Sequence, residues 1–225
     1  MSWKGLREAR EPSPPYRDPN PNKSKALNSL RSGKKIVKLT KIGESLRRKV
    51  QRSAIIDKSK EIVNNLDKKD YNILKNYIDN GHKINTELRF GGTNFSKEII
   101  SLDKSLSKIK TSTNIIVYKG MSKEYFSRFK KDDLWLDKGY VSTSIDKDKA
   151  EFFSKFFRTS TTEKRASYLI KIKLPKGTNF LYLGSVKGTP YSDDGYAPLK
   201  ELLLPRNSKF KINTIKDNEA EAELL

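Results

Sequence analysis

The uneven distribution of charge along this chain limits how much of it can fold around a core. Residues 1–60 contain 17 lysines and arginines against 5 acidic residues, a net charge of +12, whereas the whole chain of 225 residues carries +20. Five of the nine prolines lie within the first 21 residues. Segments with high net charge bury too little apolar surface to become ordered. We therefore expect residues 1–57 to be largely disordered or linker, and residues 58–225 to form one domain.

Basic and aliphatic residues interleave between Lys34 and Arg52, which leaves two structures open for this stretch. The first is a basic amphipathic helix that rests on a membrane or on an acidic partner. The second is a solvated linker, which we favour because the amphipathic pattern is weak. In either case the basic N-terminal segment is expected to bind polyanions non-specifically. Charge alone also leaves a nucleic-acid-binding protein open, although no motif of a nucleic-acid fold is present.

The residue types that are missing exclude several kinds of chemistry. The chain has no cysteine, which rules out disulfides, thiolate zinc sites and a cysteine nucleophile. His82 is the single histidine, so a Ser-His-Asp triad and a histidine-based metal site are nearly excluded, and we expect no metal. No apolar run approaches the roughly 18 residues of a membrane span. The first residues lack the apolar core of a signal peptide, and we expect none.

Helical patterns dominate the first part of the expected domain. Apolar residues between Tyr71 and Ile78 share one helical face, and Gly81 is placed to end that helix. A second helical stretch runs to the breaker Gly91-Gly92, and residues 95–109 show the clearest helical stripe. Further on, Ser122 and Asp146 are each placed to cap a helix.

Strand patterns dominate the second part. We expect strands over residues 114–118, 140–144, 168–174, 180–183, 202–204 and 210–214. The acidic triplet Glu219 to Glu223 follows them and is interpreted as a solvated tail. Because the helices precede most of the strands, the order of elements predicts an α+β fold with antiparallel pairing.

Three short stretches carry residues suited to chemistry. The first, Val117 to Gly120, ends a strand with the cation of Lys119. The second is Gly139-Tyr140-Val141-Ser142-Thr143-Ser144, in which the two serines share one face of a strand. In the third, Tyr196 to Arg206, Glu201 begins a strongly apolar strand, where a buried carboxylate needs hydrogen-bond partners.

In this order and spacing the three stretches resemble the ADP-ribosyltransferase exoenzyme family, and most of all the clostridial exoenzymes that modify Rho and the enzymatic components of binary toxins. The family has an arginine at a strand end, then Ser-Thr-Ser, then Glu/Gln-x-Glu before a Leu-Leu-Pro strand. Residues 82–89 look like its Ile-Asn-x-x-Leu-Arg helix. The resemblance covers roughly residues 60–216. It implies two antiparallel β-sheets packed face to face, with N-terminal helices and an NAD cleft between them.

The resemblance also implies roles for individual residues. Glu201 would be the catalytic carboxylate, and Ser142 would orient it. NAD would be bound as a substrate, with contacts from Tyr77, Asn85, Arg89, Lys119, Gly120, Thr143 and Ser144, and with a further phosphate contact from Arg158 or Arg165. Tyr196 and Leu199 occupy the positions with which the family recognises its protein target. Phe152 and Phe153 could stack on nicotinamide, but two core residues are the simpler interpretation.

Two departures from the family pattern keep a second function open. Lys119 stands where the family has arginine, and it lacks the planar guanidinium fork. Leu199 stands where the family has the first Glu or Gln, and it cannot handle an acceptor side chain. The first hypothesis is thus a mono-ADP-ribosyltransferase that modifies a protein, with NAD cleavage to water as a side activity. The alternative is a catalytically degenerate copy of the fold that binds a translocation or structural partner.

The expected setting follows from the same resemblance. The family implies a toxin or phage effector that is secreted or otherwise delivered into a host cell. Its partners would be a protein target in that cell and a component that translocates or delivers it, and a phage virion is one such route.

Overall fold

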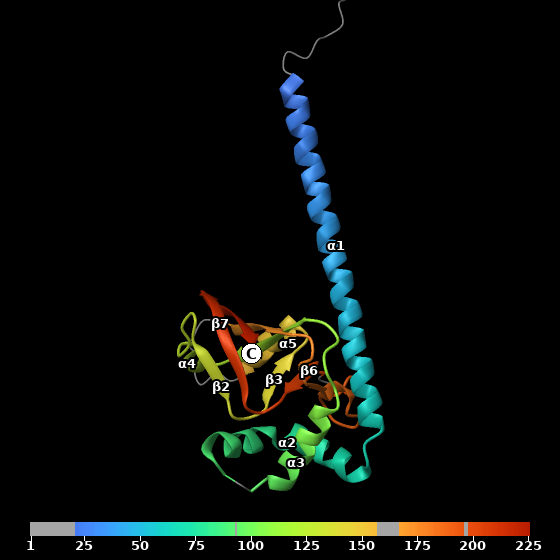
Figure 1. Ribbon diagram of the computed structural model, residues 1–225, viewed down its shortest axis with the longest axis vertical. Helices are drawn as coiled ribbons and strands as arrows, with labels where there is room; N and C mark the ends of the chain where they lie inside the picture. The colour runs from blue at the N-terminus through green and yellow to red at the C-terminus, as the bar shows by residue number, and fades with distance from the viewer. Residues whose placement is uncertain (1–20, 93, 157–166, 196–197) are drawn as a thin grey trace, which may run out of the picture. The chain divides into compact units, whose positions relative to one another are not determined.

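The computed structural model describes residues 21–92, 94–156, 167–195 and 198–225, and it divides into two compact units, Met1–Arg47 and Arg48–Leu225 (Figure 1). A single helix, α1 (Pro21–Asn64), extends from one unit into the other. The expected disorder is therefore wrong for residues 21–57, where the backbone is helical, and the helix left open for residues 34–52 is present. Residues 1–20 lie outside the described part of the chain.

The last turns of α1 belong to the folded domain. Ile55 is 6% exposed and Val63 is 2% exposed, so both are core residues. The hydroxyl oxygen of Ser59 accepts a hydrogen bond from the backbone N–H of Tyr182 at 3.1 Å. The second unit accordingly begins at Arg48, whereas the sequence pattern placed the start of the domain at residue 58.

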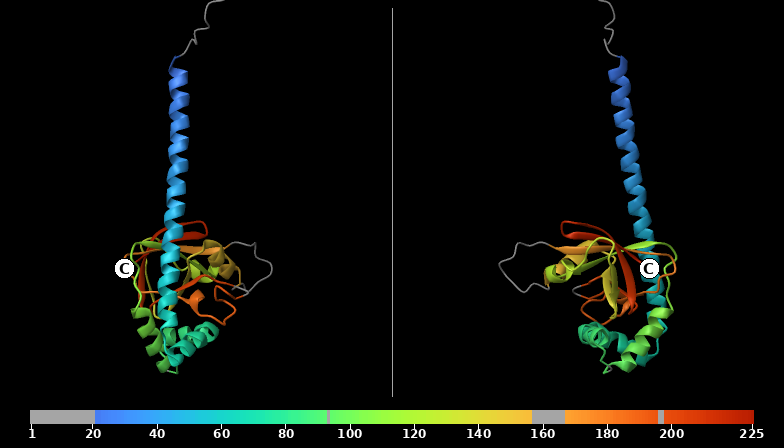
Figure 2. Two further views of the ribbon diagram at one scale, coloured as in Figure 1. Left: turned by 90° about the vertical axis from the view of Figure 1, so that its right-hand side faces the viewer. Right: turned by 60° about the vertical axis from the view of Figure 1, so that its left-hand side comes forward.

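Two further helices lie together at one end of the domain, and the turned views show the same arrangement (Figures 1 and 2). The helix α2 (Lys68–Phe90) is capped by the Asp67 side chain and ends at Gly91, whose φ of 84° is left-handed. It passes through Gly81 without a break, so the expected end there is wrong. A Cβ at Gly81 would lie 3.1 Å from the Tyr77 ring, so this glycine makes room for that ring. The helix α3 (Ser96–Ser107) follows the predicted stripe.

The strands join into one sheet in the order β2-β7-β8-β4-β1-β3-β6-β5. The first five strands in this order, β2 to β1, are joined to the last three, β3-β6-β5, by the single residue pair Tyr118 on β1 and Ser144 on β3. The bounds are β1 (Ile115–Met121), β2 (Leu134–Asp137), β3 (Val141–Ser144), β4 (Tyr168–Leu174), β5 (Leu181–Tyr182), β6 (Glu201–Leu204), β7 (Ser208–Lys216) and β8 (Glu219–Leu224). Most pairs are antiparallel, as expected, and β4 with β8 is parallel.

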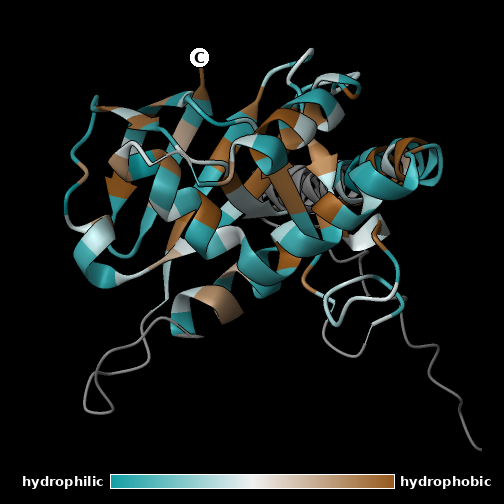
Figure 3. Ribbon diagram, turned by 90° about the horizontal axis from the view of Figure 1, so that it is seen from below, coloured by the Kyte–Doolittle hydropathy of each residue, from teal (hydrophilic) through white to brown (hydrophobic). Residues whose placement is uncertain are grey.

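Three short helical segments complete the described elements. The predicted caps are present, since Ser122 accepts from the N–H of Tyr125 before α4 (Lys123–Phe126), and Asp146 accepts from the N–H of Asp148 at α5 (Lys147–Phe156). A short 3₁₀ turn, η1 (Leu183–Ser185), follows β5. Hydrophobic and hydrophilic residues are interspersed along both the strands and the helices in the hydropathy view (Figure 3). No helix within the described ranges is long and apolar enough to cross a membrane.

The acidic triplet near the C-terminus is part of the sheet, which corrects its interpretation as a solvated tail. In β8, Ala220 and Ala222 are buried, while the glutamates that alternate with them, Glu219, Glu221 and Glu223, are more exposed. Glu221 and Glu223 pair with Lys171 and Lys173 on β4 at 2.7 and 2.8 Å. The alternation of alanine and glutamate is the period of a strand with one buried face. The charges thus lie on the solvent face of an interior strand.

Candidate active site

The candidate site is built where β3 pairs with β6. Ser144 on β3 lies opposite Glu201 on β6, and Ser142 precedes Ser144 by two residues. Since side chains alternate between the two faces of a strand, all three lie on one face of the sheet. The Ser142 side chain acts on the Glu201 carboxylate and favours its charged form. Glu201, at the start of β6, is half-buried. The structure therefore brings together the two residues that the resemblance assigned to catalysis.

Opposing effects act on the ionisation of Glu201. Burial raises the pKa of its carboxyl group, while the hydrogen bond from Ser142 and the positive charge of Lys119 counteract this increase. The net effect is a pKa above the ordinary value for glutamate. A carboxylate that is both desolvated and held by a donor is suited to stabilising a nearby developing positive charge.

Lys119, on β1, lies next to this pair. Its ammonium Nζ donates a hydrogen bond to the backbone carbonyl of Ser142 at 3.1 Å. Burial lowers the pKa of Lys119; the Asp137 and Glu201 carboxylates counteract this, and Arg89 adds to the lowering. The position where the family has arginine is thus occupied by a cation that faces the site and also supports the strand bearing Ser142.

Arg89 and Asp137 form a two-pronged ion pair beside Lys119. The Nε and Nη2 atoms of Arg89 donate to Oδ1 and Oδ2 of Asp137 at 2.9 and 3.0 Å. Sequence reasoning identified Arg89 and missed Asp137, because the strand β2 that carries it was not predicted. The alternation Leu-Trp-Leu-Asp over residues 134–137 is the signal that could have revealed this strand.

Asn85 and Tyr77 are joined to the same region by hydrogen bonds within the protein. The amide Nδ2 of Asn85 donates to the hydroxyl oxygen of Tyr77 at 3.0 Å, and its Oδ1 accepts from the backbone N–H of Tyr140 at 2.7 Å. The rings of Tyr77 and Tyr140 meet edge to face, 5.6 Å apart. These contacts tie α2 to the start of β3.

Three other predicted residues have visible packing roles. The Thr143 hydroxyl donates to the carbonyl of Leu202 at 2.6 Å, across the β3–β6 pair. The Ser144 hydroxyl lies 3.1 and 3.2 Å from the carbonyl oxygens of Leu199 and Lys200, in the turn before Glu201. Gly120 lets α5 approach β1, because a Cβ there would lie 2.0 Å from the carbonyl oxygen of Ala150.

The remaining predicted residues divide between buried positions, surface positions and positions outside the structure. Leu199 is buried, so the site where the family has its first Glu or Gln does not present a side chain to solvent. Phe152 on α5 is 57% exposed, which contradicts its interpretation as a core residue. Tyr196, Arg158 and Arg165 lie outside the described residues.

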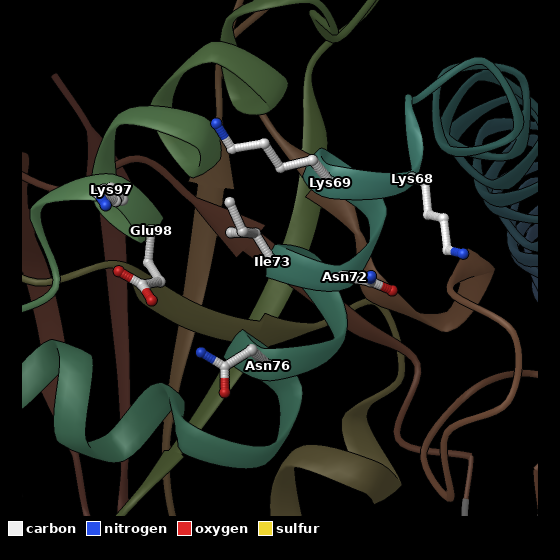
Figure 4. Close-up of a pocket in the computed structure, with 7 residues that line it drawn as sticks. All are labelled: Lys68, Lys69, Asn72, Ile73, Asn76, Lys97 and Glu98. Carbon is white, nitrogen blue, oxygen red and sulfur yellow. The ribbon is translucent and has the colours of Figure 1, made fainter.

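A separate surface groove of about 560 Å³ lies between the first turns of α2 and α3. Figure 4 shows Ile73 in its centre, surrounded by Lys68, Lys69, Asn72, Asn76, Lys97 and Glu98. We call Glu201, Ser142, Lys119, Arg89 and Asp137 the Glu201 cluster. None of these residues contributes to the groove. The candidate active site is therefore the Glu201 cluster. Within the described ranges, no three histidine, aspartate or glutamate side chains gather closely enough to hold a metal.

Comparison with known proteins supports the same family that the sequence motifs indicated. The family model for the ADP-ribosyltransferase exoenzymes matches residues 56–224. The chain belongs to this family. The match begins within α1 and ends in β8, so it includes every residue of the Glu201 cluster.

Two curated relatives show how far the similarity extends. The NAD(+)--arginine ADP-ribosyltransferase EFV of Enterococcus faecalis is 29% identical over 180 residues, which cover 77% of this exoenzyme-family chain and 34% of the relative. The mono-ADP-ribosyltransferase C3 of a Clostridium botulinum D phage is 27% identical over 169 residues, which cover 67% and 64%. The chain thus spans about a third of the first relative and slightly less than two thirds of the second.

Solved structures confirm the expected fold. Plx2a, an ADP-ribosyltransferase toxin from Paenibacillus larvae, superposes with a TM-score of 0.61 at 23% identity, covering 80% of this chain and 96% of that one. The Clostridium limosum C3 exoenzyme superposes with a TM-score of 0.58 at 23% identity, covering 77% and 93%. The mixed α+β architecture predicted from the order of elements is therefore that of the ADP-ribosyltransferase toxins.

Proposed function

We propose that this protein is a mono-ADP-ribosyltransferase that takes NAD as its substrate and transfers ADP-ribose to a protein. The observation that carries the proposal is the half-buried Glu201 carboxylate, held by Ser142 and faced by Lys119. Family membership and the names of the two curated relatives support it. Fixed charges in a partly desolvated site stabilise a transition state more strongly than the same charges in water.

In the proposed reaction, the bond between the ribose C1′ of NAD and the nicotinamide nitrogen breaks, and the bonding electrons leave with nicotinamide. Positive charge develops on the ribose, and the Glu201 carboxylate stabilises it. A lone pair of the acceptor then forms the new bond to C1′, and the acceptor releases its proton to water. Arg89 and Lys119 supply positive charge for the diphosphate of NAD, because a guanidinium and an ammonium both pair with phosphate oxygens.

The acceptor is proposed to be a side chain other than arginine. In the family, the residue two positions before the catalytic glutamate handles the acceptor, and here that residue is the buried Leu199. Cleavage of NAD with water as the acceptor is proposed as a side activity. The same leucine, together with Lys119, favours the second candidate function, a degenerate domain of this fold that binds a partner protein.

The proposed setting is a toxin or phage effector that acts inside a host cell. The toxin from Paenibacillus larvae and the phage-borne C3 enzyme support this assignment by similarity. A delivery or translocation component is proposed as a partner. Non-specific binding to polyanions is proposed for the basic N-terminal segment, which carries +12 over residues 1–60.

The decisive experiment compares nicotinamide release from NAD by the wild type, by Glu201→Gln and by Glu221→Gln. Loss of one preorganised electrostatic contact typically lowers a rate about a hundred- to a thousandfold, which is the effect expected for Glu201→Gln. Glu221→Gln is the control, because this glutamate lies on the solvent face of β8, and it is expected to keep full activity.

Three outcomes separate the hypotheses. Loss of release in Glu201→Gln alone supports the transferase. If that variant keeps more than about a tenth of the wild-type rate, Glu201 is not the catalytic carboxylate. A folded wild type that releases no nicotinamide supports the degenerate binding domain.

A further inference from the structure

We propose that Asp137 is a positioning residue that holds the Arg89 guanidinium toward the NAD diphosphate, an inference that rests on the proposed function. Asp137 binds the Nε–Nη2 edge of Arg89 at 2.9 and 3.0 Å. Its side chain is 3% exposed, whereas that of Arg89 is 40% exposed. Arginine has five N–H donors and this pair uses two of them, so the partly exposed side keeps donors for a phosphate.

Asp137 is itself held in place by the turn that follows it. Its Oδ1 accepts from the backbone N–H of Gly139 at 3.0 Å. A Cβ at Gly139 would lie 2.8 Å from Oδ1 of Asn85 and 3.3 Å from Cζ of Arg89, so a glycine is required for this close approach. Asn85 also accepts from the N–H of Tyr140. Asn85 and Arg89, which lie one helical turn apart on α2, thus both hydrogen-bond the turn from Asp137 to Tyr140.

The charge of Asp137 acts on the neighbouring cations in addition to its hydrogen bonds. Burial lowers the pKa of Arg89, but the hydrogen bonds and charge of Asp137, with smaller contributions from Tyr125 and Tyr77, raise it above its ordinary value. The Asp137 carboxylate also favours the charged form of Lys119, which Arg89 disfavours. Asp137 therefore allows two like charges to remain close together in a partly desolvated site. Without it, the two cations repel each other and Arg89 loses the partner that sets its direction.

The test measures KM and kcat for nicotinamide release, the affinity for NAD by equilibrium dialysis, and the melting temperature. Asp137→Asn keeps the size of the side chain and removes its charge. We expect its KM and its dissociation constant for NAD to rise by about ten- to a hundredfold, a usual cost of a displaced positioning group, with kcat changed by less than about threefold. Asp137→Glu restores the charge and is expected to recover part of the affinity.

Asp70→Asn is the matched control. Like Asp137, Asp70 is a buried aspartate, but it lies on α2. Its carboxylate accepts from Ser101 Oγ at 2.6 Å and from Lys104 Nζ at 3.4 Å. It lies in the first turn of the helix, whereas Arg89 lies in the last turn. Both asparagine variants are expected to lower the melting temperature, but only Asp137→Asn is expected to weaken NAD binding.

Three outcomes overturn the inference, and one other contradicts the proposed function alone. If Asp137→Asn melts lower but binds NAD with unchanged affinity, as Asp70→Asn does, Asp137 serves stability alone. If its affinity for NAD increases, Asp137 competes with the diphosphate for Arg89. A wild type that binds NAD without releasing nicotinamide contradicts the proposed function, while dialysis still decides the role of Asp137. A wild type that binds no NAD overturns both.

Discussion

The part of α1 that precedes residue 58 is expected to be necessary for the stability of the domain. Two truncated proteins test this, one starting at Arg48 and the other at residue 58. The longer deletion removes Ile55, which is buried, and Gln51, whose Nε2 donates to Thr113 Oγ1 at 3.1 Å and to the carbonyl of Asn114 at 3.3 Å. The shorter deletion removes only the separate first unit.

The size of the effect follows from these contacts. Deleting a buried isoleucine side chain costs about 2–5 kcal/mol. Each neutral hydrogen bond contributes about 0.5–1.5 kcal/mol, so the loss of the isoleucine and the two hydrogen bonds amounts to about 3–8 kcal/mol in total. For a domain of this size, each kcal/mol shifts the melting temperature by about 2–4 °C. The protein that starts at residue 58 is therefore expected to melt about 6–32 °C below the protein that starts at Arg48.

The assay is thermal unfolding of the two truncated proteins and the full chain, followed by circular dichroism. Equal melting temperatures for both truncated proteins would refute the argument, because they would show that Ile55 and Gln51 contribute nothing to the core. The same proteins test the basic segment. Residues 1–47 contain 12 basic and 4 acidic residues, so their removal is expected to reduce retention on heparin at low salt.

Three further predictions concern the site and the sheet. Ser142→Ala is expected to move the acid limb of the pH–rate profile to higher pH, because ionised Glu201 loses the hydrogen bond that counteracts its burial; an unmoved limb would contradict the pairing. The wild type is expected to release nicotinamide without modifying agmatine, because Leu199 is buried, and detection of ADP-ribosyl-agmatine by mass spectrometry would refute this. Ala222→Glu is expected to leave little folded protein by circular dichroism, because it buries an unpaired charge in the sheet, and a native-like melting curve would exclude an interior β8.

The parts of the site that sequence could predict are those built from residues close together in the chain. Ser142 and Glu201 each lie in a short stretch whose strand pattern is evident, and the structure pairs those two strands. Arg89 was found because it shares a helical motif with Asn85. Their common position on one helical face is set by spacing alone. Local periodicity and short motifs therefore carried these predictions.

The parts that sequence could not predict depend on distant contacts. Asp137 meets Arg89 across 48 positions of the chain, from a strand only four residues long. Gly81 has the local signature of a helix end, but α2 continues through it and is tied to the start of β3 by the contact of Tyr77 with Tyr140. The glutamates of β8 lie on the solvent face, but the pairing of this strand with β4 and β7 joins segments that are far apart in the sequence. In each case tertiary packing overrides a local preference.

The position of β8 inside the sheet determines when the domain can be completed during folding. This strand follows the other strands of the described residues, yet it lies between β7 and β4 and pairs with both. Until residues 219–224 are available, β4 and β7 each expose an unpaired edge, and such edges invite association between chains. A chain without its last few residues would thus lack the strand that joins β4 to β7. Synthesis from the ribosome or passage through a pore with the N-terminus leading would postpone folding until the C-terminal strand emerges.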